Sequence, residues 1–135
     1  MKTLARPPRA ETVVIDYLTA ALAAHGQDVT CGEGIPATWS PGTKPHVQVG
    51  HDGTPIVQYP ILWRASVRVT AWATATTVAQ DLAGLCEALL LCHPGSTSVG
   101  SVQSLTGMFP TRDPDTNAQL ATVSVRVNLL GAVVA

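Results

Sequence analysis

Residues that could do chemistry are few in this chain, and their spacing does not form a recognisable site. His46 and His51 flank a short predicted strand, and Cys31 is a further residue that could help them hold a zinc ion. Zinc ligands usually come in close pairs such as C-x-x-C or H-x-x-x-H, and no such pair occurs here. Polar side chains at the end of a hairpin explain the histidines better. We therefore expect no metal site and no cofactor.

The residues also do not suggest catalysis. Nucleophilic catalysis needs a Ser or Cys beside a base, and the chain has no G-x-S-x-G turn. Asp113 and Asp115 are close carboxylates, but they stand in a proline-containing loop, where aspartates commonly form turns. Residues 32–37 have the glycine spacing of a dinucleotide site, yet Pro36 stands where a helix would have to receive the phosphates. We expect the protein not to be an enzyme.

The chain carries unusually little charge. Charged residues make up 13% of its 135 residues and the net charge is −1, whereas about 25% charged is typical of soluble domains. A near-neutral balance argues against a general affinity for nucleic acid, and no apolar run is long enough to span a membrane. Such a surface suits a protein that is covered by copies of itself or by neighbours; a neutral, threonine-coated monomer is the alternative.

Periodic patterns predict the elements that would position these residues. Apolar and polar residues alternate along 63–73 and 121–129, as in strands with one buried face. Apolar residues recur at helical spacing in 10–24 and 76–92. Shorter strands are predicted in the remaining segments, at 28–31, 46–49, 56–59 and 99–107.

Turn residues connect these elements. Asp52-Gly53 predicts a two-residue hairpin turn, and 109–117 reads as a loop rich in turn residues. The predicted fold class is α+β: a mostly antiparallel β-sheet with two α-helices packed on one face, in the order helix–strands–helix–strands. By length, residues 1–135 form a single domain.

The second helix is apolar on most of its circumference, and Leu90 and Leu91 extend that surface beyond one stripe. A sheet in a small domain can cover only one side of such a helix. We therefore expect Leu90 and Leu91 to contribute to a contact between subunits.

Three arginines complete the set of candidates. Arg64 and Arg68 lie on the same side of one predicted strand, and Arg126 lies on the polar side of the other. If these strands are neighbours, the three guanidinium groups share a face. That face could simply be solvated. Alternatively, it could line a pore or pair with carboxylates of another subunit, for which the candidates are Asp81, Glu87 and Asp113.

At this level of organisation the chain resembles the tail terminator (tail completion) proteins of long-tailed bacteriophages. The resemblance lies in the early amphipathic helix, in the strand at 63–69 that leads into a helix beginning at Thr77, and in the loop at 109–114 before a final alternating strand at 122–127. It implies an α+β subunit that closes into a ring, usually of six copies. The second helix could form one contact surface of each subunit and a sheet edge the other. Such a ring caps the tail tube, ends its polymerisation and joins the tail to the head or neck.

The resemblance also implies partners and a place in the virion. The partners would be other copies of the chain, the major tail tube protein and head or neck connector proteins, with DNA passing transiently through the pore. The site would be the head–tail junction, after assembly in the host cytoplasm. A loop and hairpin region within 32–60 would project towards the tube, with Trp39 and Tyr59 as contact candidates. A neck, head-completion or minor tail protein is one alternative; a small α+β ligand-binding domain or enzyme is another.

Overall fold

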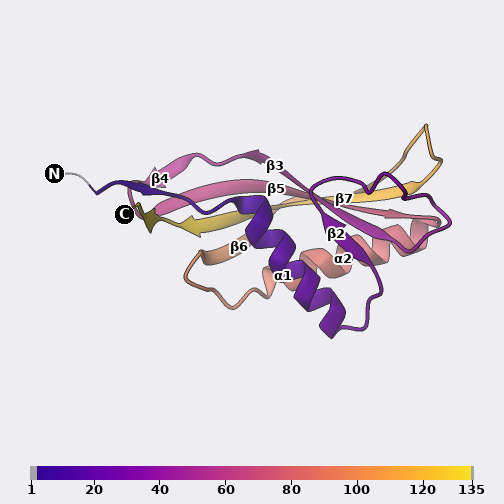
Figure 1. Ribbon diagram of the computed structural model, residues 1–135, viewed down its shortest axis with the longest axis horizontal. Coiled ribbons are helices and arrows are strands. Elements are labelled where there is room, and N and C mark those ends of the chain that lie inside the picture. Colours follow the sequence, from indigo (N-terminus) through magenta and orange to yellow (C-terminus); the bar gives the residue numbers. More distant parts are fainter. Residues whose placement is uncertain (1–2, 135) are drawn as a thin grey trace.

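The computed structural model describes residues 3–134, which form two layers (Figure 1). Both helices pack on one face of a six-stranded sheet. A separate two-stranded sheet joins the two ends of the chain. The elements are β1 (Ala5–Arg6), α1 (Ala10–Ala24), β2 (Thr30–Gly32), β3 (His46–Gly53), β4 (Ile56–Gln58), β5 (Leu62–Ala73), α2 (Thr76–Leu91), β6 (Val99–Arg112), β7 (Gln119–Leu130) and β8 (Ala132–Val133).

The α+β class and the one-sided helix layer agree with the prediction, but two details differ. The strand order is β2-β3-β5-β7-β6, with β4 paired to β5. Because β2 runs parallel to β3, the sheet is mixed, although every other pair in it is antiparallel. The element order is also not helix first, since β1 precedes α1 and pairs with β8.

The predicted hairpin turn at Asp52-Gly53 is wrong. Strand β7 pairs along one edge of β5 for its whole length, so β3 and β4 both lie on the other edge, one after the other. The register shifts between His51 and Gly53, where Gly53 has a φ of +141°. The flexibility of glycine therefore serves a bulge in a continuing strand. The chain reverses later, where the Ile61 N–H donates to the Gln58 carbonyl at 2.8 Å.

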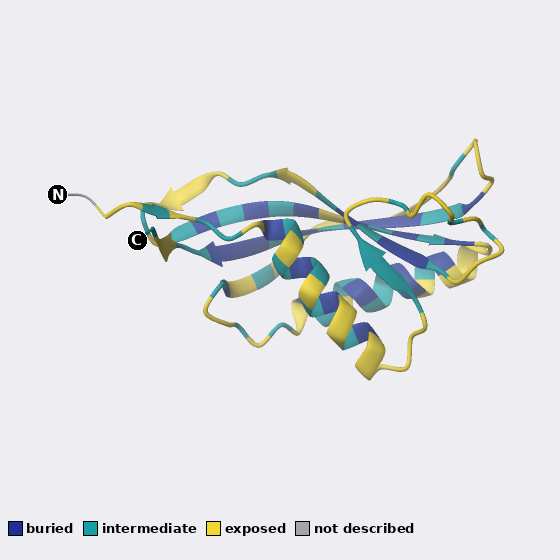
Figure 2. Ribbon diagram, viewed as in Figure 1, coloured by how far each residue is buried: buried dark blue, intermediate teal, exposed yellow. Residues whose placement is uncertain are grey.

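The core lies between the sheet and the helices. Every second residue of β5 is buried, from Trp63 to Ala73, and β7 shows the same alternation through most of its length (Figure 2). Helix α1 presents Val14, Leu18 and Leu22 to this core, each at most 2% exposed. Apolar side chains at these spacings account for both the helices and the central strands.

Strand β6 is longer than the sequence predicts. The segment 109–112, predicted as part of a loop, continues β6 and pairs with β7, leaving the turn to residues 113–118. Pro110 is compatible with this pairing because β6 is the last strand of the sheet, so an N–H on its outer side needs no partner strand.

Candidate interaction surfaces

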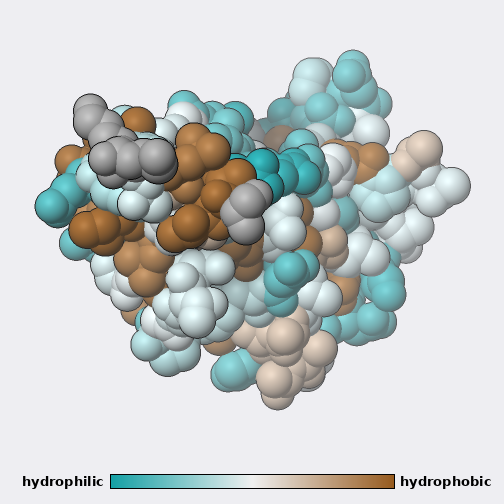
Figure 3. Space-filling view, turned by 60° about the vertical axis from the view of Figure 1, so that its left-hand side comes forward, coloured by the Kyte–Doolittle hydropathy of each residue, from teal (hydrophilic) through white to brown (hydrophobic). Residues whose placement is uncertain are grey.

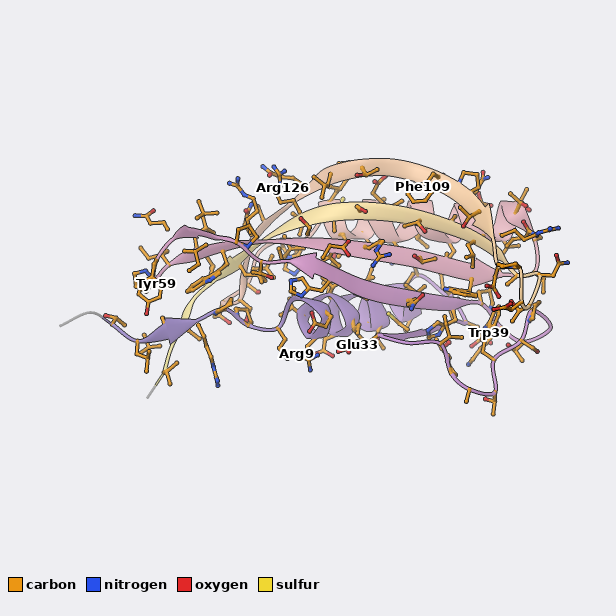
Figure 4. The ribbon with its side chains drawn as sticks, turned by 90° about the horizontal axis from the view of Figure 1, so that it is seen from above. Arg9, Glu33, Trp39, Tyr59, Phe109 and Arg126 are labelled. Carbon is orange, nitrogen blue, oxygen red and sulfur yellow. The ribbon has the colours of Figure 1, made fainter. Side chains whose placement is uncertain are left out.

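The three candidate arginines share one face of the sheet, as predicted. In the register between β5 and β7, Ser66 stands opposite Arg126 and Arg68 stands opposite Ser124. The alternate residues of β5 are buried towards the helices, so the arginines occupy the opposite side. We call this side the open face, and Figure 4 looks onto it. Its residues on the two central strands are Arg64, Ser66, Arg68, Thr70, Thr122, Ser124, Arg126 and Asn128.

Hydrogen bonds orient part of the open face. The Arg64 Nε donates to Asn128 Oδ1 at 3.3 Å, and Asn128 Nδ2 donates to Ser101 Oγ at 2.7 Å, which links β5, β7 and β6. Arg68 pairs with Asp52 of β3 at 3.0 Å. These bonds fix the positions of the Arg64 and Arg68 side chains on the open face.

Helix α2 is covered by its own chain to a greater extent than the sequence indicates. It packs against β5, β6, β7 and α1. Leu90 is 1% exposed, so the proposed role of its side chain in a subunit contact is wrong. The sheet is wide enough to lie under several positions around the helix, and α1 covers a further side. Leu91 remains 43% exposed and Val78 remains 42% exposed.

The edge strand β6 carries an uncovered apolar surface. Leu105, Met108 and Phe109 are 40–44% exposed, and no residue from Val99 to Thr111 carries a charge. Natural edge strands are usually protected by charges or by covering elements, because an unpaired backbone edge can pair with another chain. A sheet edge was expected as a contact surface, but the sequence did not identify it as β6. The feature of the sequence that indicates this surface is the absence of charged residues from 96–111.

A second apolar surface surrounds the paired chain ends (Figure 3). We call it the terminal patch. It combines side chains from β4, from β8, from the turn before β5 and from the residue before β1, and they are 43–72% exposed. Single exposed apolar residues are ordinary, but a contiguous group of this kind marks an interaction site. The members of the patch are Leu4, Ile56, Val57, Tyr59, Ile61 and Val133.

Tyr59, a candidate for contact with a tail tube, already has contacts within the chain. Its hydroxyl donates to the Thr3 carbonyl at 2.7 Å and accepts from the Ala5 N–H at 3.1 Å. Its ring packs edge-on against Trp63 at a centroid distance of 5.9 Å. Tyr59 therefore fastens the N-terminal strand to the sheet, while its remaining surface belongs to the terminal patch.

Trp39 also packs within the chain (Figure 4). Its ring meets Trp72 edge to face at 5.7 Å, and its Nε1 donates to the Lys44 carbonyl at 3.0 Å. Because β3 and β4 belong to the sheet, the loop at 33–45 is the one long segment of the region predicted to project that lies outside regular structure. Trp39 holds this loop against the end of β5.

Asp113 has the turn role that the sequence analysis considered for it. Its carboxylate accepts hydrogen bonds from the N–H and the hydroxyl of Thr116, at 2.9 and 2.6 Å. These bonds lower the pKa of Asp113 by stabilising its charged form. The hairpin that it closes lies at the end of the molecule away from both chain ends (Figure 1).

The histidines considered as zinc ligands lie apart in function and environment. His46 is 2% exposed, and its ring nitrogens bond Thr30 Oγ1 and the Gly34 carbonyl, each at 2.6 Å. It is thus a buried structural residue rather than a polar hairpin residue, and burial lowers its pKa. His51 faces Glu11 at 3.4 Å. Residues 3–134 contain no group of three His, Cys, Asp or Glu side chains arranged to hold a metal ion.

An open hollow of about 320 Å³ lies between α2 and the chain following α1. Its lining is mostly apolar, with Asp81 and Gln27 as the polar side chains. Small-molecule sites usually bring several polar groups together, and this hollow does not. None of the described helices is both long and apolar enough to cross a membrane.

Comparison with known proteins shows a likeness in fold. No family model matches the chain, and no curated protein matches it. A solved structure titled "Virion of native gene transfer agent (GTA) particle" contains a chain with a similar fold, at a TM-score of 0.62 and 14% sequence identity. The alignment covers 92% of this chain and 100% of that one. At this identity the likeness shows a shared fold.

Proposed function

We propose that this chain is a structural subunit of a phage-like virion and acts as a tail terminator. The observation that carries the proposal is the uncharged, exposed edge strand β6, whose apolar side chains need a partner to shield them. Two further facts support it. The terminal patch provides a second such surface, and the fold is shared over nearly the whole chain with a component of a virion particle.

In this proposal identical copies close into a ring, with six as the expected number. A ring needs two different, complementary surfaces on each subunit, because its contacts are head to tail. The ring caps the tail tube at the head–tail junction, ends tube growth and receives head or neck connector proteins. It assembles in the host cytoplasm, and DNA later passes through its pore.

The proposed role is structural rather than enzymatic. A neck, head-completion or minor tail protein would need the same kinds of surface, so the tail-tube assay below separates these roles. A small ligand-binding domain is the alternative of another class, and the open hollow beside Asp81 is where its ligand would bind. Saturable thermal stabilisation by a metabolite would favour that alternative.

The direct test combines sedimentation with a tube-capping assay. The purified chain should form a closed oligomer whose population rises with protein concentration. Added to growing tubes of the cognate major tail tube protein, it should stop elongation and sit at one tube end in negative-stain micrographs. A chain that stays monomeric at the highest attainable concentration and leaves tube length unchanged would refute the proposal.

A matched pair of variants tests the role of β6. Phe109→Glu places a charge among the exposed apolar residues of the edge, and we expect it to abolish capping while the circular dichroism spectrum stays native. Thr97→Glu places the same charge in the exposed loop before β6 and should leave capping unchanged. Equal activity of the two variants would contradict a role for the edge.

A further inference from the structure

Charges of opposite sign are separated between the two layers of the subunit. Helices α1 and α2, Ala10–Ala24 and Thr76–Leu91, carry four acidic residues and no Lys or Arg. Strands β5 and β7 carry three arginines and no acidic residue. In a chain with so few charges this separation gives the subunit one cationic side and one anionic side. The acidic residues are Glu11, Asp16, Asp81 and Glu87.

Most of these charges have no partner within the subunit. Glu11 pairs with Arg9, and Arg68 pairs with Asp52. Among residues 3–134, however, no ion pair involves the exposed Asp16 or Asp81, or Arg64 or Arg126 on the open face. Both sides therefore present charges that another molecule can neutralise.

The shape of each side also allows close approach. Between the arginines, the open face carries small residues such as Ser66 and Ser124. The outer side of α2 includes Gly84 and the exposed Ala88. Small residues let two backbones come near, so that long charged side chains can reach across the contact.

We propose that copies of this chain associate front to back, with the helix layer of one copy lying on the open face of the next. Asp16 and Asp81 of the first copy then oppose Arg64 and Arg126 of the second. This rests on the proposed function and names the two surfaces through which the ring forms. The two sides belong to the same subunit and differ from each other, which is the condition for a head-to-tail contact that can close. The contact leaves β6 and the terminal patch for other virion proteins.

Charge reversal provides a test in which the variants rescue each other. Arg64→Glu with Arg126→Glu makes both sides of the subunit negative, and Asp16→Arg with Asp81→Arg makes both sides positive. Each variant should repel itself, and sedimentation velocity should show its dissociation constant raised by about 100-fold. An equimolar mixture should assemble again, because each negative side then meets a positive side. An even-numbered ring accommodates the alternation.

Arg6→Glu with Arg112→Glu is the matched control. It reverses the same number of arginines on β1 and at the end of β6, neither of which is among the four residues of the proposed contact, and should assemble like the wild type. Recovery in the mixture shows that both reversed variants are folded. If one fails to fold, wild-type protein still provides a test: its dissociation constant should rise on going from about 50 to about 500 mM salt.

The outcomes separate the hypotheses. Three results would overturn this interface without refuting the ring itself. They are self-assembly of either reversed variant with the dissociation constant of the wild type, a mixture of folded variants that stays dissociated, and a wild-type dissociation constant that does not change with salt. Loss of duplex DNA binding by the Arg64→Glu, Arg126→Glu variant with unchanged assembly would instead assign the open face to nucleic acid. A wild-type chain that never assembles would refute the proposed function itself.

Discussion

Substituting alanine for Gly131 is expected to destabilise the subunit strongly. Gly131 joins β7 to β8, and its N–H donates to the Ile61 carbonyl at 2.8 Å. A Cβ added there would lie 2.2 Å from the Pro60 carbonyl oxygen and 2.5 Å from Cζ3 of Trp63. Both contacts are far inside van der Waals separation. The oxygen is backbone and the ring is buried, so neither can turn away without moving the turn before β5.

The expected cost follows from overpacking. Inserting a methyl group into a well-packed site typically costs 1–3 kcal/mol, and more where backbone must shift, so we expect a loss of about 3 kcal/mol in the free energy of unfolding. For a domain of this size that corresponds to a fall of roughly 10 °C in the midpoint of thermal unfolding. Urea denaturation and a thermal melt followed by circular dichroism measure both quantities.

Gly84→Ala is the matched control, because the same substitution should there have the opposite sign. Gly84 lies inside α2, and a Cβ added to it meets nothing within 4 Å. Alanine is favoured over glycine in a helix by about 0.8–1 kcal/mol, so the melting temperature should rise. If the free energy of unfolding of Gly131→Ala lies within about 0.5 kcal/mol of the wild-type value, the steric reasoning is refuted.

Three further predictions concern single groups. Tyr59→Phe removes the hydroxyl that holds β1, so amide exchange in residues 3–6 should quicken by about tenfold; unchanged exchange would deny the fastening role. Burial lowers the pKa of His46 from its usual 6.5, so the unfolded state binds the proton more readily. The free energy of unfolding should therefore stay constant above pH 6.5 and decrease as the pH is lowered below it. His46→Gln should make this decrease smaller in an acid titration. Burial raises the pKa of Cys31 to about 11 and that of Cys86 to about 12, whereas Cys92 is exposed. Ellman's reagent should thus titrate Cys92 rapidly in the native protein and all three thiols after denaturation.

Periodicity predicted the parts of the fold in which burial alone decides the structure. Apolar residues alternate in β5 and β7 and recur at helical spacing in α1 because one side of each element is buried. The structure agrees closely with these patterns. The shared face of Arg64, Arg68 and Arg126 followed from the same alternation once the two strands proved to be neighbours.

The errors arose where local signals competed with long-range pairing. Gly53 reads as a turn residue, but β5 offers a partner edge on which the strand continues past it through a bulge. Pro110 reads as a loop residue, but β6 pairs with β7 on one side only. Leu90 reads as exposed apolar surface because the sequence of α2 does not show how many strands lie beneath the helix. The width of the sheet decides how much of the helix is covered.

The pairing of β1 with β8 has a practical consequence for following the assembly. Residues 3–6 and 132–134 leave the molecule at the same end, opposite the hairpin at 113–118. In a ring whose axis runs along the length of the subunit, fluorophores or affinity tags joined to either terminus would gather on a single rim. A probe on the hairpin would mark the other rim, so two labels are enough to tell which side of an assembled particle a binding partner has reached.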